Sequence, residues 1–235
     1  MRAATRWATM GAVAADPSRV RPAYLAAAGR AVALLRSPDV GQRWSEPSLL
    51  RELTVGALAA HLARSVLLVE TYLDEGAPDV QRTLTAQEYY GRLGQLTDFD
   101  SPLNAGVRER SIAGAAAAGA TGVAEQAQAC LGRLETRLPA EPLDRRMPAV
   151  GGAVIGFDEF LRTRLVELAV HSEDLALSVG LPVTDAGVAE EGVAEAVAEA
   201  VDVMVGAARV RHGDAAVLRA LTRRERDDVD ALRVL

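Results

Sequence analysis

Two residues that can bind a metal ion, Glu167 and His171, lie four positions apart in the segment with the strongest helical periodicity of the chain. On a helix, side chains at positions i and i+4 project from the same face, one turn apart. The pair can therefore supply two ligands to a single ion. The simpler interpretation is a surface pair, because Glu and His at this spacing also occur on exposed helices.

His61 is the third residue that the pattern selects as a ligand. It lies in register with Leu58 and Ser65 on a largely apolar stripe, so we expect it to point inward. An inward His can also be a hydrogen-bonded core residue, but two of the three His in the chain fall on such stripes. Three ligands from two helices would leave coordination positions open, as in a reactive site. The remaining His212 follows Arg211 at a predicted helix break, where the positive charge disfavours a cation.

Four further residues are candidates for supporting roles. Arg108 and Arg110 begin a predicted helix and could bind a carboxylate group of a small molecule in bidentate fashion. Arg164, one turn before the ligand carboxylate, could orient it or bind a substrate anion. Asp174 lies near the second His of the pair and could hold its other ring nitrogen. The simpler interpretation of Arg108 and Arg110 is a solvated helix start, and Asp174 could also lie in an exposed last turn.

The elements that would position these residues are four long predicted helices. They cover residues 16–35, 54–76, 105–138 and 157–179. Gly114, Gly119 and Gly122 lower the helix propensity of the third and predict a kink there. The fold class predicted from this pattern is all-α, a four-helix bundle.

The segments outside the bundle are shorter. Residues 1–15 are expected to be a loose N-terminus, residues 16–182 the metal-binding bundle, and residues 183–235 a helical C-terminal extension packed on it. A long connection with a short helix near residues 86–93 is expected before the third bundle helix. In the extension, one apolar face is predicted from Val188, Val193, Val197, Val201, Met204 and Val205, followed by Val217, Leu218 and Leu221.

The composition narrows the class of protein. Of the 235 residues 49% are hydrophobic and only 4% aromatic, so small aliphatic side chains must form the core, which favours helices. The net charge of −6 disfavours a nucleic-acid partner. The absence of a long apolar segment argues against a membrane span or a signal peptide, so we expect a cytoplasmic protein. Cys130, the single cysteine, excludes a Cys-based zinc site and is expected to be an inert core thiol.

Two longer motifs surround the predicted ligands. Residues 53–62 read LTVGALAAHL and follow Trp44 and Pro47-Ser48, and residues 167–176 read ELAVHSEDLA. In this order the two motifs resemble the signature segments of the mycothiol-dependent maleylpyruvate isomerase family, part of the DinB-like metalloprotein superfamily. The resemblance covers most of residues 16–181.

The resemblance implies a DinB-like four-helix bundle that binds zinc or a similar divalent ion through His61, Glu167 and His171. It also implies mycothiol, a low-molecular-weight thiol of high-GC bacteria, as co-substrate, and all 26 basic residues of this chain are Arg, which fits such a host. A divalent ion lowers the pKa of a bound thiol, and the thiolate can add to an electrophilic small molecule. The outcome is S-transfer or, by addition, rotation and elimination, cis–trans isomerisation.

One departure from the family concerns the C-terminal part. The isomerase itself carries a larger α/β C-terminal domain that contributes to the substrate site, whereas residues 184–235 are short and have a helical pattern. This difference favours an S-transferase, or a relative with another substrate, over the named isomerase. Two alternatives stay open: a non-catalytic metal-bearing or ligand-binding bundle, which could form a homodimer through an apolar helix face, and a hydrolase that uses metal-activated water.

Overall fold

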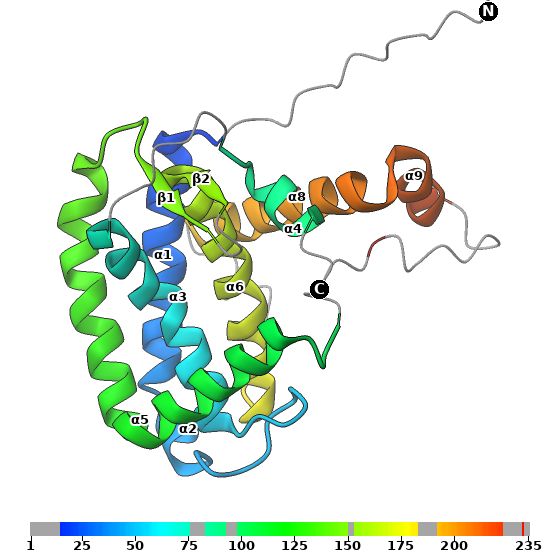
Figure 1. The fold of residues 1–235 in the computed structure, drawn as a ribbon. Coiled ribbons are helices and arrows are strands. Elements are labelled where there is room, and N and C mark those ends of the chain that lie inside the picture. Colours follow the sequence, from blue (N-terminus) through cyan, green and yellow to red (C-terminus); the bar gives the residue numbers. More distant parts are fainter. Residues whose placement is uncertain are drawn as a thin grey trace, which may run out of the picture.

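The computed structural model describes residues 15–75, 83–92, 98–149, 153–182, 192–222 and 232. Four long helices lie side by side and form the bundle (Figure 1). They are α1 (Pro17–Leu35), α3 (Val55–Glu75), α5 (Pro102–Arg137) and α6 (Phe157–Ser178). The prediction of an all-α bundle is confirmed. The predicted loose N-terminus lies almost entirely outside the described residues.

Side-chain caps fix where two of these helices begin. Asp16 precedes α1, and its Oδ1 accepts a hydrogen bond from the Ser18 amide at 3.0 Å. Ser101 precedes α5, and its Oγ accepts from the Asn104 amide at 3.2 Å. With Pro102 in the first turn, this cap starts α5 three residues earlier than the alanine-rich pattern predicts, because both residue types favour a helix start.

Helix α5 bends at Gly119, one of the three glycines at which a kink is predicted. Gly119 has φ 62° and ψ −179°, a conformation that glycine adopts without the steric cost that a Cβ brings. The bend separates α5 into two arms that run in different directions (Figure 1). The C-terminal arm completes the bundle, and the N-terminal arm carries Ser111 to His61 on α3.

The bundle core is built largely from small side chains, as the low aromatic content predicts. Alanines on α1 and α3 are buried, and they let neighbouring helices approach closely. Larger side chains fill the space between them. The fully buried large ones of the bundle helices include Tyr24, Leu58, Leu62, Leu73, Leu134, Leu161 and Leu165.

A short antiparallel hairpin precedes α6 and was not predicted. Its strands are β1 (Arg146–Pro148) and β2 (Val154–Gly156), with Met147 opposite Ile155, both fully buried. Strands of three residues give too little alternation for a sequence pattern. The Leu84 amide donates to the Val154 carbonyl at 2.8 Å and so ties the chain before α4 (Ala86–Arg92) to the hairpin.

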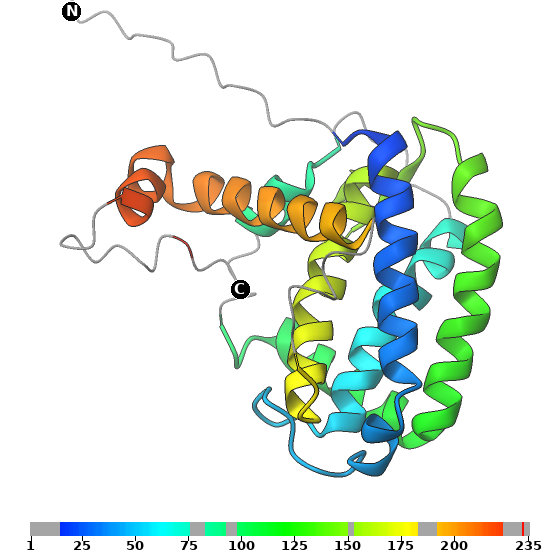
Figure 2. The ribbon, with the colours of Figure 1, turned by 180° about the vertical axis from the view of Figure 1, so that it is seen from behind.

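Helices α8 (Val193–His212) and α9 (Asp214–Thr222) follow the bundle. Figure 2 shows α8 crossing α1 and α6 instead of running along them, and α8 also packs along α4. The predicted valine face is wrong: Val201 is 54% exposed, and the other described members of that face are only half-buried, namely Val193, Val197, Met204 and Val205. Val188 lies outside the described residues. The buried face consists mainly of smaller residues, namely Ala196, Ala200, Val203, Ala207 and Ala208.

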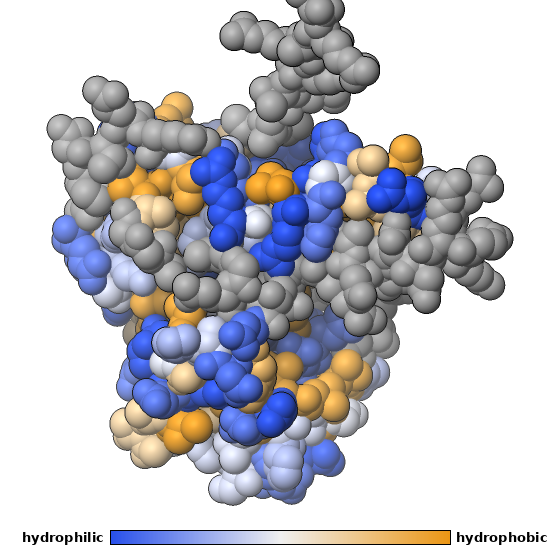
Figure 3. Space-filling model, turned by 45° about the vertical axis from the view of Figure 1, so that its right-hand side comes forward, coloured by the Kyte–Doolittle hydropathy of each residue, from blue (hydrophilic) through white to orange (hydrophobic). Residues whose placement is uncertain are grey.

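Helix α9 packs through Val217 alone among its three predicted contact residues, since Leu218 and Leu221 are exposed. Hydrophilic and hydrophobic residues are interspersed over the side of the molecule that carries α8 and α9 (Figure 3). None of the helices in the described ranges is long and apolar enough to cross a membrane.

Candidate metal centre

The structure brings His61, Glu167 and His171 together between α3 and α6. Oε2 of Glu167 lies 3.4 Å from Nε2 of His171 and 3.7 Å from Nε2 of His61. One donor atom from each residue lies within 4.8 Å of the other two. The side chains are 17–19% exposed, so the three donors are sheltered and still reachable by a small molecule.

The spacing of these donors fits a single divalent ion. Tetrahedral ligands at bond lengths of ~2.0–2.1 Å lie about 3.3 Å from one another. The two distances from Oε2 of Glu167, 3.4 and 3.7 Å, are close to that value. Two imidazole nitrogens and one carboxylate oxygen are also the donor set of known catalytic zinc sites, which keep a fourth position for water or substrate.

Both histidines have an acceptor at the ring nitrogen that faces away from Glu167. Oδ2 of Asp174 lies 3.0 Å from Nδ1 of His171, and Oγ of Ser111 lies 3.4 Å from Nδ1 of His61. A hydrogen on Nδ1 in each ring would leave the Nε2 lone pair facing the centre of the site. The side chains therefore favour the tautomers that can bind an ion.

Glu167 has a comparable partner at its second oxygen. The hydroxyl of Tyr90, on α4, donates to Oε1 at 2.8 Å and also lies 3.1 Å from the Thr163 carbonyl. Oε2 is thereby left for the two histidines. No local signal in the sequence marks Tyr90, because 77 positions separate it from Glu167. Ser111 was missed for the same reason.

The three predicted ligands shift each other's pKa. Burial opposes the charge of Glu167, but hydrogen bonds with both histidines and the charge of Arg164 hold its pKa well below the usual range. Burial also opposes the charge of His171, yet hydrogen bonds with Asp174 and Glu167 raise its pKa to about 9. Burial lowers the pKa of His61, and Glu167 offsets this only in part. At neutral pH and without an ion, His171 therefore carries the proton and His61 is neutral.

The predicted arginines separate into two groups. Arg108 contacts the chain before α5: Nη1 donates to the Phe99 carbonyl at 2.7 Å, the guanidinium lies 4.1 Å from the Phe99 ring centre, and Nε lies 3.4 Å from a Glu52 oxygen. These contacts engage Nη1, Nε and one face of the guanidinium. Arg108 therefore belongs to the local structure before α5 and not to the donor cluster.

Arg110 and Arg164 belong to the second group, together with Arg64, which the sequence analysis did not single out. Burial lowers the pKa of Arg64, and the positive charges of Arg110 and Arg164 lower it further, so the three guanidiniums share one region. Among the described residues, none of the three forms an ion pair within 4 Å. Arg64 stands one turn after His61, a helical spacing that would have identified it.

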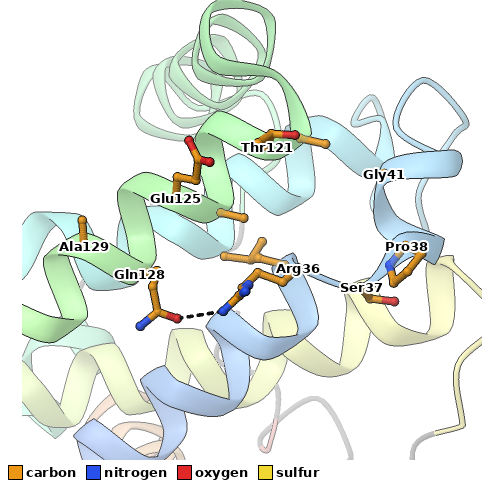
Figure 4. A pocket seen from close by; sticks show the side chains of 11 residues that line it. Arg36, Ser37, Pro38, Gly41, Thr121, Glu125, Gln128 and Ala129 are labelled. Carbon is orange, nitrogen blue, oxygen red and sulfur yellow. Dashed lines mark hydrogen bonds between the residues drawn. The ribbon is translucent and has the colours of Figure 1, made fainter.

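One surface hollow lies away from the donor cluster. A cavity of about 580 Å³ separates the end of α1 and helix α2 (Pro38–Gln42) from α5, near the bend at Gly119. Figure 4 shows its lining, in which Arg36 donates to Gln128 at 3.4 Å. None of its lining residues is a predicted ligand or a partner of one.

Comparison with known proteins agrees with the motifs. No curated protein and no solved structure matches the chain. A family model described as the mycothiol maleylpyruvate isomerase N-terminal domain matches residues 24–176, which include all three clustered donors. The match covers well over half of the sequence, and on that ground the chain belongs to the mycothiol maleylpyruvate isomerase N-terminal domain family.

Proposed function

We propose that this chain is a divalent-metal-dependent enzyme that uses a low-molecular-weight thiol, mycothiol, to modify an electrophilic small molecule. The ion, zinc in the first instance, would be held by His61, Glu167 and His171. The observation that carries the proposal is the clustering of these three donors at the spacing of a single ion, within a chain of this family. A bound divalent ion would lower the pKa of a thiol that coordinates it, so that the thiol is present as a thiolate at neutral pH.

The chain's own residues prepare the site in two ways. Asp174 and Ser111 orient the histidine rings, and the partial burial of the donors limits the water that reaches them. Arg164 and Arg110 are proposed to bind an anionic group of a substrate, because a guanidinium donates two parallel hydrogen bonds to a carboxylate. Arg164 is the nearer of the two in sequence to the ligands, one turn before Glu167.

Between the two reactions, we propose S-transfer ahead of cis–trans isomerisation. The residues that follow the family match form helices α8 and α9, in the place where the isomerase has an α/β domain. A substrate site built with that domain would therefore differ here. The proposal leaves the electrophile defined by its chemistry, a small molecule that accepts a thiolate.

The metal content of purified protein tests the site. We expect one divalent ion per chain by elemental analysis and loss of most of it in His61→Ala, Glu167→Ala and His171→Ala. His212→Ala is the matched control, since this third His is exposed at the end of α8 and should leave the metal content unchanged. Full metal content in all three ligand variants would refute the assignment.

Thiol chemistry tests the activity. Mycothiol and a bimane-type electrophile, incubated with the metal-loaded protein, should form the conjugate faster than without protein, and removal of the ion should abolish the difference. Other low-molecular-weight thiols serve as comparison substrates. Conjugation at the uncatalysed rate with every thiol, in a protein that retains its ion, would favour the non-catalytic binding bundle.

A further inference from the structure

Helix α4 stands outside the four-helix bundle and yet delivers one hydroxyl group to the metal centre. Tyr90 is 1% exposed, and its ring packs in a second core cluster with Val166 of α6 and Val203 of α8. The hydroxyl donates to Oε1 of Glu167 at 2.8 Å. A buried ring that packs among side chains of α6 and α8 has little freedom to move its hydroxyl away from the carboxylate.

The hydrogen bond determines which oxygen of Glu167 faces the histidines. Oε1 is occupied by Tyr90, and Oε2 is the atom within 3.7 Å of both Nε2 atoms. Without the hydroxyl, the carboxylate could rotate about its last bond, and ordering it again would cost conformational entropy when an ion binds. Partners of this kind usually affect metal affinity about 10- to 100-fold.

Helix α8 fixes the position of α4 through unusually close contacts. A Cβ added at Gly91 would lie 2.6 Å from the Val210 side chain, and one at Gly206 would lie 2.3 Å from Cγ of Gln87. Each of the two helices therefore has a glycine at the point where the other helix comes closest, Gly91 on α4 and Gly206 on α8. Arg211 adds a polar contact, since its Nη2 donates to the main-chain carbonyl of Tyr90 at 2.8 Å.

We infer that Tyr90 is a positioning residue for the ligand carboxylate of Glu167, and that α8 sets its position through α4. The C-terminal helix then contributes to ion affinity without supplying a ligand. This inference rests on the proposed metal site. The competing interpretation is that the Tyr90 hydroxyl only stabilises the fold, through its hydrogen bond to the Thr163 carbonyl, and has no effect on ion binding.

Tyr90→Phe separates these interpretations, because it removes the hydroxyl and keeps the ring. We expect zinc affinity, measured by competition with a chelator, to fall about 10-fold or more. With Co²⁺ in place of zinc, the visible spectrum should change as the carboxylate loses its fixed orientation. Tyr24→Phe is the matched control: it removes another buried hydroxyl, which donates to the Ser65 carbonyl at 3.1 Å, and should leave both readouts unchanged.

The outcomes distinguish this inference from the proposed function. If wild-type protein binds zinc and Tyr90→Phe binds it equally tightly with the same Co²⁺ spectrum, the positioning role is refuted and the metal site stands. If wild-type protein binds no divalent ion, the proposed function itself fails. Thermal unfolding of the metal-free variants shows whether any loss of affinity in Tyr90→Phe merely follows lost stability, which would also overturn the inference.

The contribution of α8 is tested by a double-mutant cycle. Arg211→Met removes the contact with the Tyr90 main chain and should weaken zinc binding in the wild-type background. In the Tyr90→Phe background, Arg211→Met should have little further effect on zinc affinity. The hydroxyl through which Arg211 is inferred to act is already missing there. Gly206→Ala, which pushes α4 and α8 apart, gives a second variant for the same cycle. Equal losses of affinity in both backgrounds would show that α8 does not act through Tyr90.

Discussion

Ion binding at this site should depend steeply on pH, and the structure assigns the dependence to one residue. In the metal-free protein the hydrogen bonds with Asp174 and Glu167 outweigh burial and raise the pKa of His171 to about 9. An ion can bind Nε2 only after the proton leaves the ring. His61, whose pKa is lowered, is already neutral at pH 7 and contributes no such dependence.

The size of the loss in apparent ion affinity follows from the difference between the pH of the measurement and the pKa of His171. Below pH 9, each unit of falling pH should weaken apparent ion affinity about tenfold, and above it the affinity should level off. Between pH 9 and pH 7 the loss is about 100-fold, or ~2.7 kcal/mol of binding free energy. About one proton should leave the protein for each ion bound at neutral pH.

Two measurements check this prediction. Chelator competition over a pH series gives the slope of affinity against pH, with the chelator's own protonation taken into account. Calorimetry in buffers of different ionisation enthalpy gives the number of protons released. Asp174→Asn is the informative variant, because removing the charge beside Nδ1 should lower the pKa of His171 and flatten the slope near pH 7. Affinity that is constant from about pH 6.5 to 9, without proton release, would refute the assignment of the proton to His171.

Three further predictions concern stability. The raised pKa of His171 stabilises the metal-free fold fully below about pH 6.5, and this stabilisation is lost as the pH rises through 9, so the melting temperature of the metal-free protein should fall across that window. Arg21→Met leaves the buried Asp158 carboxylate without its partner at 2.7 Å and should cost about 3–5 kcal/mol, or roughly 6–20 °C in melting temperature. Gly206→Ala forces a Cβ to within 2.3 Å of a side chain on α4 and should cost about 1–3 kcal/mol in denaturant unfolding. Gly132→Ala is the matched control for that variant: a Cβ at Gly132 would meet no atom within 4 Å, so stability should stay unchanged or rise by about 1 kcal/mol.

The parts of the site that lie within one helix could be predicted from the sequence. Glu167 and His171 are related by one helical turn, and a local pattern suffices to place them on one face. His61 required a further step, the assumption that two inward stripes meet, and the close packing of α3 with α6 satisfies it. Arg64 could have been found by the same reasoning, because it stands one turn after His61.

The contacts that support the ligands could not be predicted in this way. Ser111 reaches His61 because α5 bends at Gly119, and the sequence indicates a kink there without its direction. Arg108 seemed suited to an anion because it begins a helix, but its position lets it bind the Phe99 carbonyl instead. Such choices depend on which segments meet in space, and helix periodicity carries no information on that.

The extension after the bundle shows why hydrophobicity alone misjudges a helix contact. A scale that ranks valine above alanine selects Val201 as part of the buried face, whereas α8 buries Ala200 and Ala207. Small residues form the contact because α4 and α8 approach so closely that a glycine on each helix meets side chains of the other. Larger side chains on this face of α8 would hold the two helices apart. The same close approach is what holds Tyr90 in place, so the residues that look least informative in the sequence of α8 are those through which it can influence the metal centre.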